Sequence, residues 1–222
     1  MKKGIRVLFE DDYYVVFDKP AGIVVIPIPR NDEKTLVDIV NRQYASRLNS
    51  IKLHPCHRID RDTSGAIIFS KGKHAQKIMM DKFRQQEVRK TYIAFVHGRI
   101  NNKAGEIKSS VQNIERQRFQ QRMPQRPAVT RYKLIAHKKM FSIVEAYPIT
   151  GRTNQIRIHF KQIGHPLVGE RKYAFARDYS LKFRRAALHA HMLQWVHPVT
   201  GKKVKVASGL ADDMQRFLAM HS

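Results

Sequence analysis

The chain contains the stretch His57-Arg58-Ile59-Asp60-Arg61-Asp62-Thr63-Ser64-Gly65, which runs directly into Ala66-Ile67-Ile68-Phe69. A run of alternating charges is usually a solvated surface segment. This one ends on consecutive apolar residues, a pattern typical of a buried strand. We therefore expect the charged stretch to form a loop and turn at the start of that strand, where a rigid scaffold can hold functional side chains.

Asp60 is the residue of this stretch that we expect to carry chemistry. It lies between Arg58 and Arg61, and nearby positive charge favours the ionised form of a carboxyl group. An ionised aspartate can act as a nucleophile or as a base. It can equally tie a loop together through ion pairs, and the residues leave both readings open. The polar residues at 62–64 are expected to hydrogen-bond within the turn before Gly65.

The composition is strongly basic. The 222 residues include 42 Lys and Arg against 18 Asp and Glu, which gives a formal net charge of +24. Such an excess favours a nucleic-acid partner, because neutralising phosphates releases counterions. A membrane surface is the competing partner, but the chain has no apolar run long enough to span a bilayer, and Met1–Ile5 offers no amphipathic helix or lipidation signal. We therefore expect a cytoplasmic protein that binds nucleic acid and no membrane.

Apolar periodicity predicts both strands and helices. The expected strands lie at residues 5–9, 13–18, 66–70, 89–96, 128–136, 141–149, 188–196 and 203–207. The expected helices begin at Thr35, run over 73–86, open at 151–153 and occupy 211–220. Thr35 with Asp38 resembles a capping box, which marks a helix start. Length and composition favour one domain over residues 1–222, and the single cysteine, Cys56, excludes an internal disulfide.

Residues 101–127 are polar and carry a basic segment at 116–126. We expect this part of the chain to be a mobile insertion or a hairpin arm. Its basic segment is either a solvated loop or part of a groove that tracks a phosphate backbone. The sequence does not decide between these two readings.

Signals for a cofactor are missing from the sequence. No glycine-rich phosphate loop follows an expected strand. His54, Cys56 and His57 lie close together, but no second pair stands at the spacing of a zinc site. We expect chemistry that uses neither a cofactor nor a metal ion.

The stretch at 57–65 is one of several motifs that follow one another along the chain. The others are Phe9-Glu10-Asp11-Asp12 with Lys19-Pro20-Ala21-Gly22, Arg89-Lys90-Thr91-Tyr92-Ile93-Ala94, Gly151-Arg152-Thr153-Asn154-Gln155-Ile156-Arg157-Ile158-His159, Gly164-His165-Pro166-Leu167 and Leu188-His189-Ala190. This ordered set resembles the RluA family of RNA pseudouridine synthases over nearly the whole chain.

The resemblance implies an isomerase that converts uridine to pseudouridine in ribosomal or transfer RNA without a cofactor. By this resemblance Asp60 would attack the ribose or remove one of its protons, Tyr92 would stack on the flipped base, and Arg157 would pair with Asp60. Arg58 would fill the space left by the flipped nucleotide or contact its phosphate. The residues expected to bind the substrate are Arg58, Arg61, Arg152 and Gln155.

Together with the many short strands, the resemblance predicts a mixed α/β (α+β) fold, with a largely antiparallel twisted sheet, flanking helices and an RNA cleft near the three catalytic residues. The chain begins almost directly with the first motif, so no separate N-terminal RNA-binding domain is expected, and a monomer is the default. Asn154 stands where the family commonly has histidine, Glu170 where it has aspartate, and Ile26 precedes Pro27 where histidine is frequent. We expect these departures to affect substrate choice more than chemistry.

Two other functions fit parts of the sequence. An RNA-binding or ribosome-assembly factor with the same fold would do no chemistry, but it would be expected to lack the aspartate, tyrosine or arginine, and all three are present. A glycosidase or nucleosidase would usually need a second carboxylate as acid or base. Asp62 is too close to Asp60 in sequence to be assigned that role.

Overall fold

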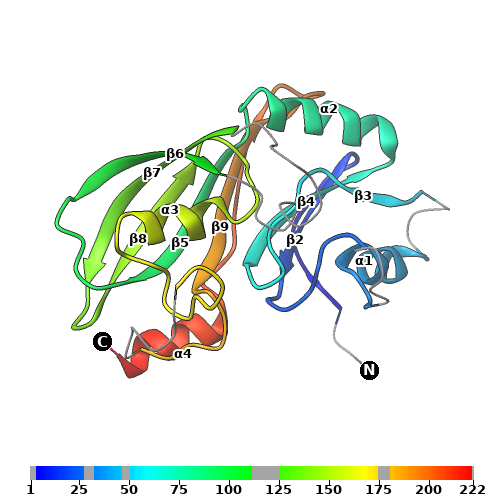
Figure 1. Ribbon diagram of the computed structural model, residues 1–222. Coiled ribbons are helices and arrows are strands. Elements are labelled where there is room, and N and C mark those ends of the chain that lie inside the picture. The colour runs from blue at the N-terminus through cyan, green and yellow to red at the C-terminus, as the bar shows by residue number, and fades with distance from the viewer. Residues whose placement is uncertain (1–3, 28–32, 47–50, 112–125, 175–180, 222) are drawn as a thin grey trace, which may run out of the picture. The chain divides into compact units, whose positions relative to one another are not determined.

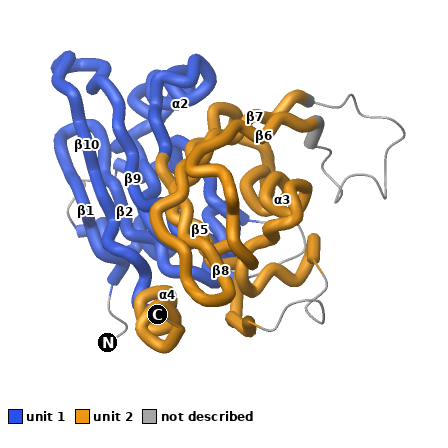
Figure 2. The backbone as a smooth tube through the Cα atoms, turned by 90° about the vertical axis from the view of Figure 1, so that its left-hand side faces the viewer, with its two compact units in different colours: residues 1–90, 189–213 blue, residues 91–188, 214–222 orange. Residues whose placement is uncertain are grey.

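The computed structural model describes residues 4–27, 33–46, 51–111, 126–174 and 181–221. These residues form ten strands and four helices (Figure 1). The chain divides into two compact units, one of residues 1–90 with 189–213 and the other of residues 91–188 with 214–222 (Figure 2). Each unit contains both strands and helices.

Unit 1 holds the N-terminal strands and the hairpin near the C-terminus. Its elements are β1 (Arg6–Glu10), β2 (Tyr14–Lys19), α1 (Leu36–Tyr44), β3 (Leu53–Pro55), β4 (Ser64–Lys71), α2 (Lys73–Arg84), β9 (Leu188–Val196) and β10 (Lys203–Ala207). The strands β1, β2 and β4 pair antiparallel, β3 also pairs with β4, and β10 pairs with β9. The pair of β4 and β9 is parallel.

Helices cover both faces of the β2–β4 pair. Tyr14 and Val16 pack in one core with Met79 of α2, whereas Phe17 meets Tyr44 of α1 edge to face, with ring centroids 5.7 Å apart. Alternate residues of a strand point to opposite faces, so β2 is buried from both sides. The predicted capping box of α1 is present, with Thr35 and Asp38 bonded reciprocally.

Unit 2 is an antiparallel sheet with the strand order β5-β8-β7-β6. Its elements are β5 (Arg89–His97, from Thr91 onward in this unit), β6 (Ala104–Val111), β7 (Arg126–His137), β8 (Phe141–Pro148), α3 (Gln155–Gln162) and most of α4 (Asp212–Met220). Ile156 and Phe160 of α3 pack against Val96, Tyr132 and Val144 of the sheet. At α4, Phe217 contacts the rings of Phe95 and Phe141.

The predicted fold class is confirmed: both units mix strands with flanking helices, and the strand pairings within each unit are antiparallel except that of β4 with β9. Of the two alternatives predicted for residues 101–127, the hairpin is confirmed over residues 104–111, which form strand β6 and pair with β7 from Ala104 to Val111. The basic segment lies outside the described residues up to 125.

Candidate active site

The loop that carries Asp60 joins β3 to β4 in unit 1. Ile59 and Thr63 of this loop are buried. The backbone N–H of Thr63 donates to the carbonyl of Asp60 at 3.1 Å. The loop is therefore a closed turn that leads into β4, as the sequence predicts. Asp60 itself is half-buried.

Lys19, at the end of β2, binds this loop through hydrogen bonds. It is fully buried, and its Nζ donates to the carbonyls of Pro20, Ile23 and Arg61 at 3.0, 2.8 and 2.8 Å. The N–H of Gly22 donates to the same Arg61 carbonyl at 2.9 Å. A buried ammonium requires such acceptors in place of water. The Lys-Pro-Ala-Gly motif thus connects directly to the residue that follows Asp60.

His57 fastens the other end of the loop. Its Nε2 accepts a hydrogen bond from the backbone N–H of Ile68 in β4 at 3.1 Å, and its ring lies 4.4 Å from that of Phe83. Desolvation, together with the neighbouring Lys90 charge, lowers the pKa of His57 to about 3. The imidazole is therefore neutral at physiological pH, as an acceptor of a backbone N–H must be at that nitrogen.

The turn after Asp60 is locked to strand β9. Gly65 has φ +109°, and a Cβ atom there would lie 2.3 Å from the carbonyl oxygen of Ala190. Beside it, the Ser64 hydroxyl lies 3.0 Å from Nδ1 of His189. Ser64 and Gly65 pair with His189 and Ala190 in the parallel register. These contacts explain why a small residue and a hydroxyl stand at the start of β4.

The two arginines beside Asp60 differ in their surroundings. Arg58 is exposed. Arg61 donates from Nη2 to both carboxylate oxygens of Glu33 at 2.7 and 2.6 Å, and from Nε to the Gly22 carbonyl at 3.3 Å. Both side chains of that ion pair are about half exposed, so the pair contributes little to stability.

Tyr92 lies on β5 in unit 2, opposite Ala146 of β8. It is half-buried and packs against the core that contains Ala94 and Val96. These residues share the face of the strand that α3 covers. Tyr92 is therefore held on a strand of the sheet and not on a loop.

Arg157 on α3 forms an ion pair with Glu170. Its Nε and Nη2 donate to Oε2 and Oε1 of Glu170, both at 2.7 Å, and its Nη1 donates to Oδ1 of Asn154 at 2.7 Å. Burial acts to raise the pKa of Glu170, but the hydrogen bonds and charge of Arg157 outweigh it and lower that pKa. Arg157 is therefore a largely buried residue and not a solvated one on the helix surface.

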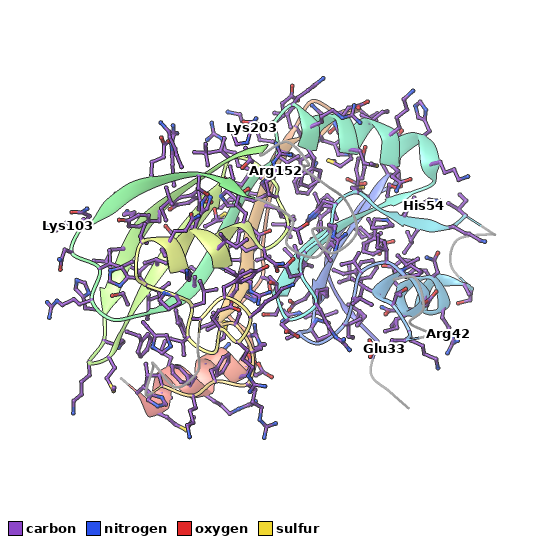
Figure 3. The ribbon with its side chains drawn as sticks, in the orientation of Figure 1. Glu33, Arg42, His54, Lys103, Arg152 and Lys203 are labelled. Atoms are coloured by element: carbon purple, nitrogen blue, oxygen red, sulfur yellow. The ribbon has the colours of Figure 1, made fainter. Side chains whose placement is uncertain are left out.

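Gln155 and Arg152 organise the turn before α3. The buried Gln155 donates from Nε2 to the Val129 carbonyl at 3.0 Å and the Thr130 hydroxyl at 2.9 Å. Its Oε1 accepts from the Thr150 hydroxyl and from the backbone N–H of Arg152. This geometry gives Gln155 a structural task, and its contact with substrate stays a prediction. Arg152, labelled in Figure 3, donates from Nε to the Pro127 carbonyl at 3.4 Å.

One end of unit 2 carries basic side chains and no acidic one among the residues of three adjoining segments, 97–104, 133–142 and 161–166. Hydrogen bonds join these segments: the N–H of Gly98 donates to the Met140 carbonyl, and that of Leu134 to the Lys103 carbonyl. We call this region the basic end; its charged residues are Arg99, Lys103, Lys133, Lys138, Lys139 and Lys161. Figure 3 marks it by Lys103, in the turn between β5 and β6.

Comparison with solved structures identifies the fold. The chain superposes on the human RNA pseudouridylate synthase domain containing 4 with a TM-score of 0.78, covering 97% of this chain and 92% of that one at 22% identity. The fold is therefore that of a pseudouridine synthase domain.

Comparison of sequences assigns the family. Residues 13–162 match the family described as RNA pseudouridylate synthase. An uncharacterized RNA pseudouridine synthase of Bacillus subtilis, YhcT, is 34% identical over 96% of this chain and 71% of its own length. Ribosomal large subunit pseudouridine synthase D of Zymomonas mobilis is 34% identical over 97% of this chain and 72% of its own. The chain belongs to this family of isomerases, which convert uridine to pseudouridine in RNA.

The motifs identify Asp60, Tyr92 and Arg157, but the contacts of Lys19, His57 and Glu170 are not predicted. Lys19 and Glu170 stand in motifs or next to them, and their partners lie 42 and 13 residues away. His57 belongs to the central motif, but its hydrogen bond to Ile68 has no local signal. The signal for Lys19 is a lysine at the end of a strand that is buried on both faces.

Proposed function

We propose that this chain converts uridine to pseudouridine in ribosomal RNA. The observation that carries the proposal is the Asp60 loop, a carboxylate turn held by Lys19 and His57 in a chain of this family. The choice of ribosomal RNA is supported by the relative from Zymomonas mobilis, whose name states that it acts as a ribosomal large subunit pseudouridine synthase.

The reaction breaks the bond between N1 of uracil and C1′ of ribose and joins C5 to C1′. The product contains the same atoms as the substrate, so the balance requires only that a proton leave C5 and that N1 take one up. Asp60 either attacks the sugar or removes a ribose proton. Both routes need an ionised carboxylate, which nearby arginine charge favours.

The remaining residues have roles in binding. Tyr92 stacks on the uracil once the nucleotide is flipped out of its helix or loop, which repays part of the cost of unstacking. By the family resemblance, Arg157 would pair with Asp60 and favour its ionised form. Arg58, Arg61 and Arg152 contact phosphate or occupy the space that the flipped nucleotide leaves. Gln155 supports the turn that carries Arg152.

RNA affinity comes from the formal net charge of +24, with the basic end of unit 2 as a concentrated part of it. We expect the enzyme to act as a monomer in the cytoplasm. No helix of the described residues is long and apolar enough to cross a membrane. One catalytic domain over residues 1–222 also stays a prediction, supported by a family match that runs across the boundary between the units.

Nucleoside chromatography tests the proposal and the substrate together. Purified protein is incubated with unmodified transcripts of large-subunit ribosomal RNA and, separately, of transfer RNA, and the digested RNA is separated into nucleosides. We expect pseudouridine in the ribosomal transcript. Pseudouridine in transfer RNA alone would mean that transfer RNA, and not ribosomal RNA, is the substrate. Tight RNA binding without pseudouridine in either transcript would favour an inactive assembly factor.

A further inference from the structure

The surroundings of Arg157 contain more than one fixed contact. Glu170 takes two of its N–H groups in a parallel fork, and Asn154 takes a third, all at 2.7 Å. The side chain of Arg157 is 14% exposed and that of Glu170 is 1% exposed. Paired contacts of this kind fix the plane of a guanidinium as well as its position.

Glu170 is itself held in place. Its Oε1 also accepts from the backbone N–H groups of Lys172 and Tyr173 at 2.8 and 3.3 Å. The preceding residues pack against β5: the N–H of Val168 donates to the Phe95 carbonyl at 2.8 Å, and Leu167 bridges to Val96. The carboxylate is therefore attached to the strand that also carries Tyr92.

Gly169 makes this attachment rigid. Its φ is +76°, and a Cβ atom there would lie 2.1 Å from the carbonyl oxygen of Arg185. The chain therefore passes Arg185 too closely to allow a side chain at 169. The carboxylate of the next residue cannot shift without moving this contact.

Asn154 contributes through an uncommon backbone conformation. It stands at the N-cap of α3 with φ 56° and ψ 18°, in the left-handed region, and its side chain makes no capping hydrogen bond. Asparagine at an N-cap usually accepts from the first turn of its own helix. Here its oxygen accepts from Arg157 instead, so the residue serves the arginine rather than the helix end.

We propose that Glu170 and Asn154 are positioning residues that set the orientation of the Arg157 guanidinium for catalysis, an inference that rests on the proposed function. Ion pairs with one buried partner contribute little net stability, since desolvation offsets attraction. A fixed guanidinium, however, meets an anionic partner without having to reorganise, and such preorganisation is what accelerates a reaction.

Glu170→Gln tests the proposal, because it keeps the side-chain shape and removes the charge. In single-turnover reactions with saturating enzyme, we expect the rate constant to fall by at least about tenfold, as a displaced catalytic group predicts, while RNA affinity stays near the wild-type value. Glu170→Asp, which keeps the charge, should recover part of the rate. Glu106→Gln is the matched control: it removes the carboxylate of an exposed ion pair with Arg131 in the same unit, and its rate should be unchanged.

A second readout does not depend on activity. The Nε–H resonance of Arg157, assigned by its loss in Arg157→Lys, should exchange slowly with water in the wild type and rapidly in Glu170→Gln. A full single-turnover rate in folded Glu170→Gln overturns the proposal. So does a slower rate that goes with a lower melting temperature while the Arg157 resonance stays protected. If the wild type modifies no RNA, the proposed function fails, and the resonance alone then decides whether Glu170 holds Arg157.

Discussion

Lys19 illustrates how one buried charge can serve a neighbouring loop. Its ammonium joins the end of β2 to the carbonyl of Arg61, next to the expected catalytic carboxylate. Lysine is almost never fully buried unless it is paired. The three carbonyl acceptors provide that pairing, and they make the geometry of the Asp60 loop dependent on a residue from a different motif.

Replacing Lys19 by methionine should therefore affect both stability and rate. Three carbonyls lose the Lys19 ammonium, although that of Arg61 keeps the N–H of Gly22. We expect the free energy of unfolding in urea to fall by about 3 kcal/mol, within the range for buried groups left unpaired. The single-turnover rate of the remaining folded enzyme should also fall. The exposed Lys34→Met is the control. Equal stability of both variants would show that the Lys19 contacts contribute nothing.

His57 gives a prediction about pH. Its pKa is lowered from 6.5 to about 3 in the folded protein, so the unfolded chain binds a proton between these values while the folded chain does not. Stability then rises with pH in this window, and the contribution of His57 is complete above pH 6.5 and lost as the pH falls toward 3.

The test compares urea unfolding of the wild type and His57→Gln at several pH values. Glutamine can still accept the N–H of Ile68 through its amide oxygen but does not titrate. We expect the wild type to lose stability more steeply below pH 6.5, by up to about 1.4 kcal/mol per pH unit, the slope of one proton. Parallel curves would contradict the assignment. His74→Gln, on the exposed surface of α2, should leave the slope unchanged.

At the scale of elements, most of the fold could be predicted because apolar periodicity reflects burial. The strands β2, β4 and β5 are read correctly, as are α1 with its capping box and α2. Strand β3 is three residues long, too short for periodicity to detect. In β6, Ile107 is the buried apolar side chain, and the strand forms because β7 offers it a partner, which the local sequence does not reveal.

The candidate site could be predicted only in part, for a related reason. Asp60, Tyr92 and Arg157 stand in motifs that a resemblance identifies. The contacts of Lys19 and Glu170 depend on how distant segments meet after folding, and no local pattern encodes a partner 42 residues away.

The start of β4 gives a prediction at this scale. Gly65→Ala places a Cβ atom 2.3 Å from the Ala190 carbonyl and keeps a positive φ, so the parallel pair of β4 and β9 must separate. We expect a loss of more than about 3 kcal/mol in the free energy of unfolding, or no folded protein. Gly22→Ala is the matched control, because Gly22 has φ +88° with no atom within 4 Å of the added Cβ. It should cost only about 1 kcal/mol from backbone strain. Equal melting temperatures for the two variants would contradict the account of the β4–β9 contact.

At the scale of the whole molecule, the charge of +24 is the dominant property. Binding that depends on phosphate neutralisation weakens steeply as salt concentration rises. Part of this positive charge is concentrated at the basic end, whose segments carry Arg99, Lys103 and the other basic residues named above and no acidic residue. RNA contacts should therefore be unevenly distributed over the surface.

Charge reversal tests that distribution. The triple change Lys103→Glu, Lys138→Glu and Lys139→Glu should lower RNA affinity at moderate salt by at least about tenfold and make the salt dependence shallower. The matched control reverses three exposed lysines of unit 1, Lys52, Lys73 and Lys77, with the same change in net charge. It should lose much less affinity. Equal losses would mean that net charge, not the basic end, determines binding.

The most direct test of the central claim is tritium release from ribosomal RNA transcripts labelled at C5 of uridine, because isomerisation must remove that hydrogen. The account predicts release by the wild-type protein and none by Asp60→Asn, which keeps the size of the side chain and should still bind the RNA. Undiminished release by Asp60→Asn, or no release by the wild type from any RNA that it binds, would contradict it.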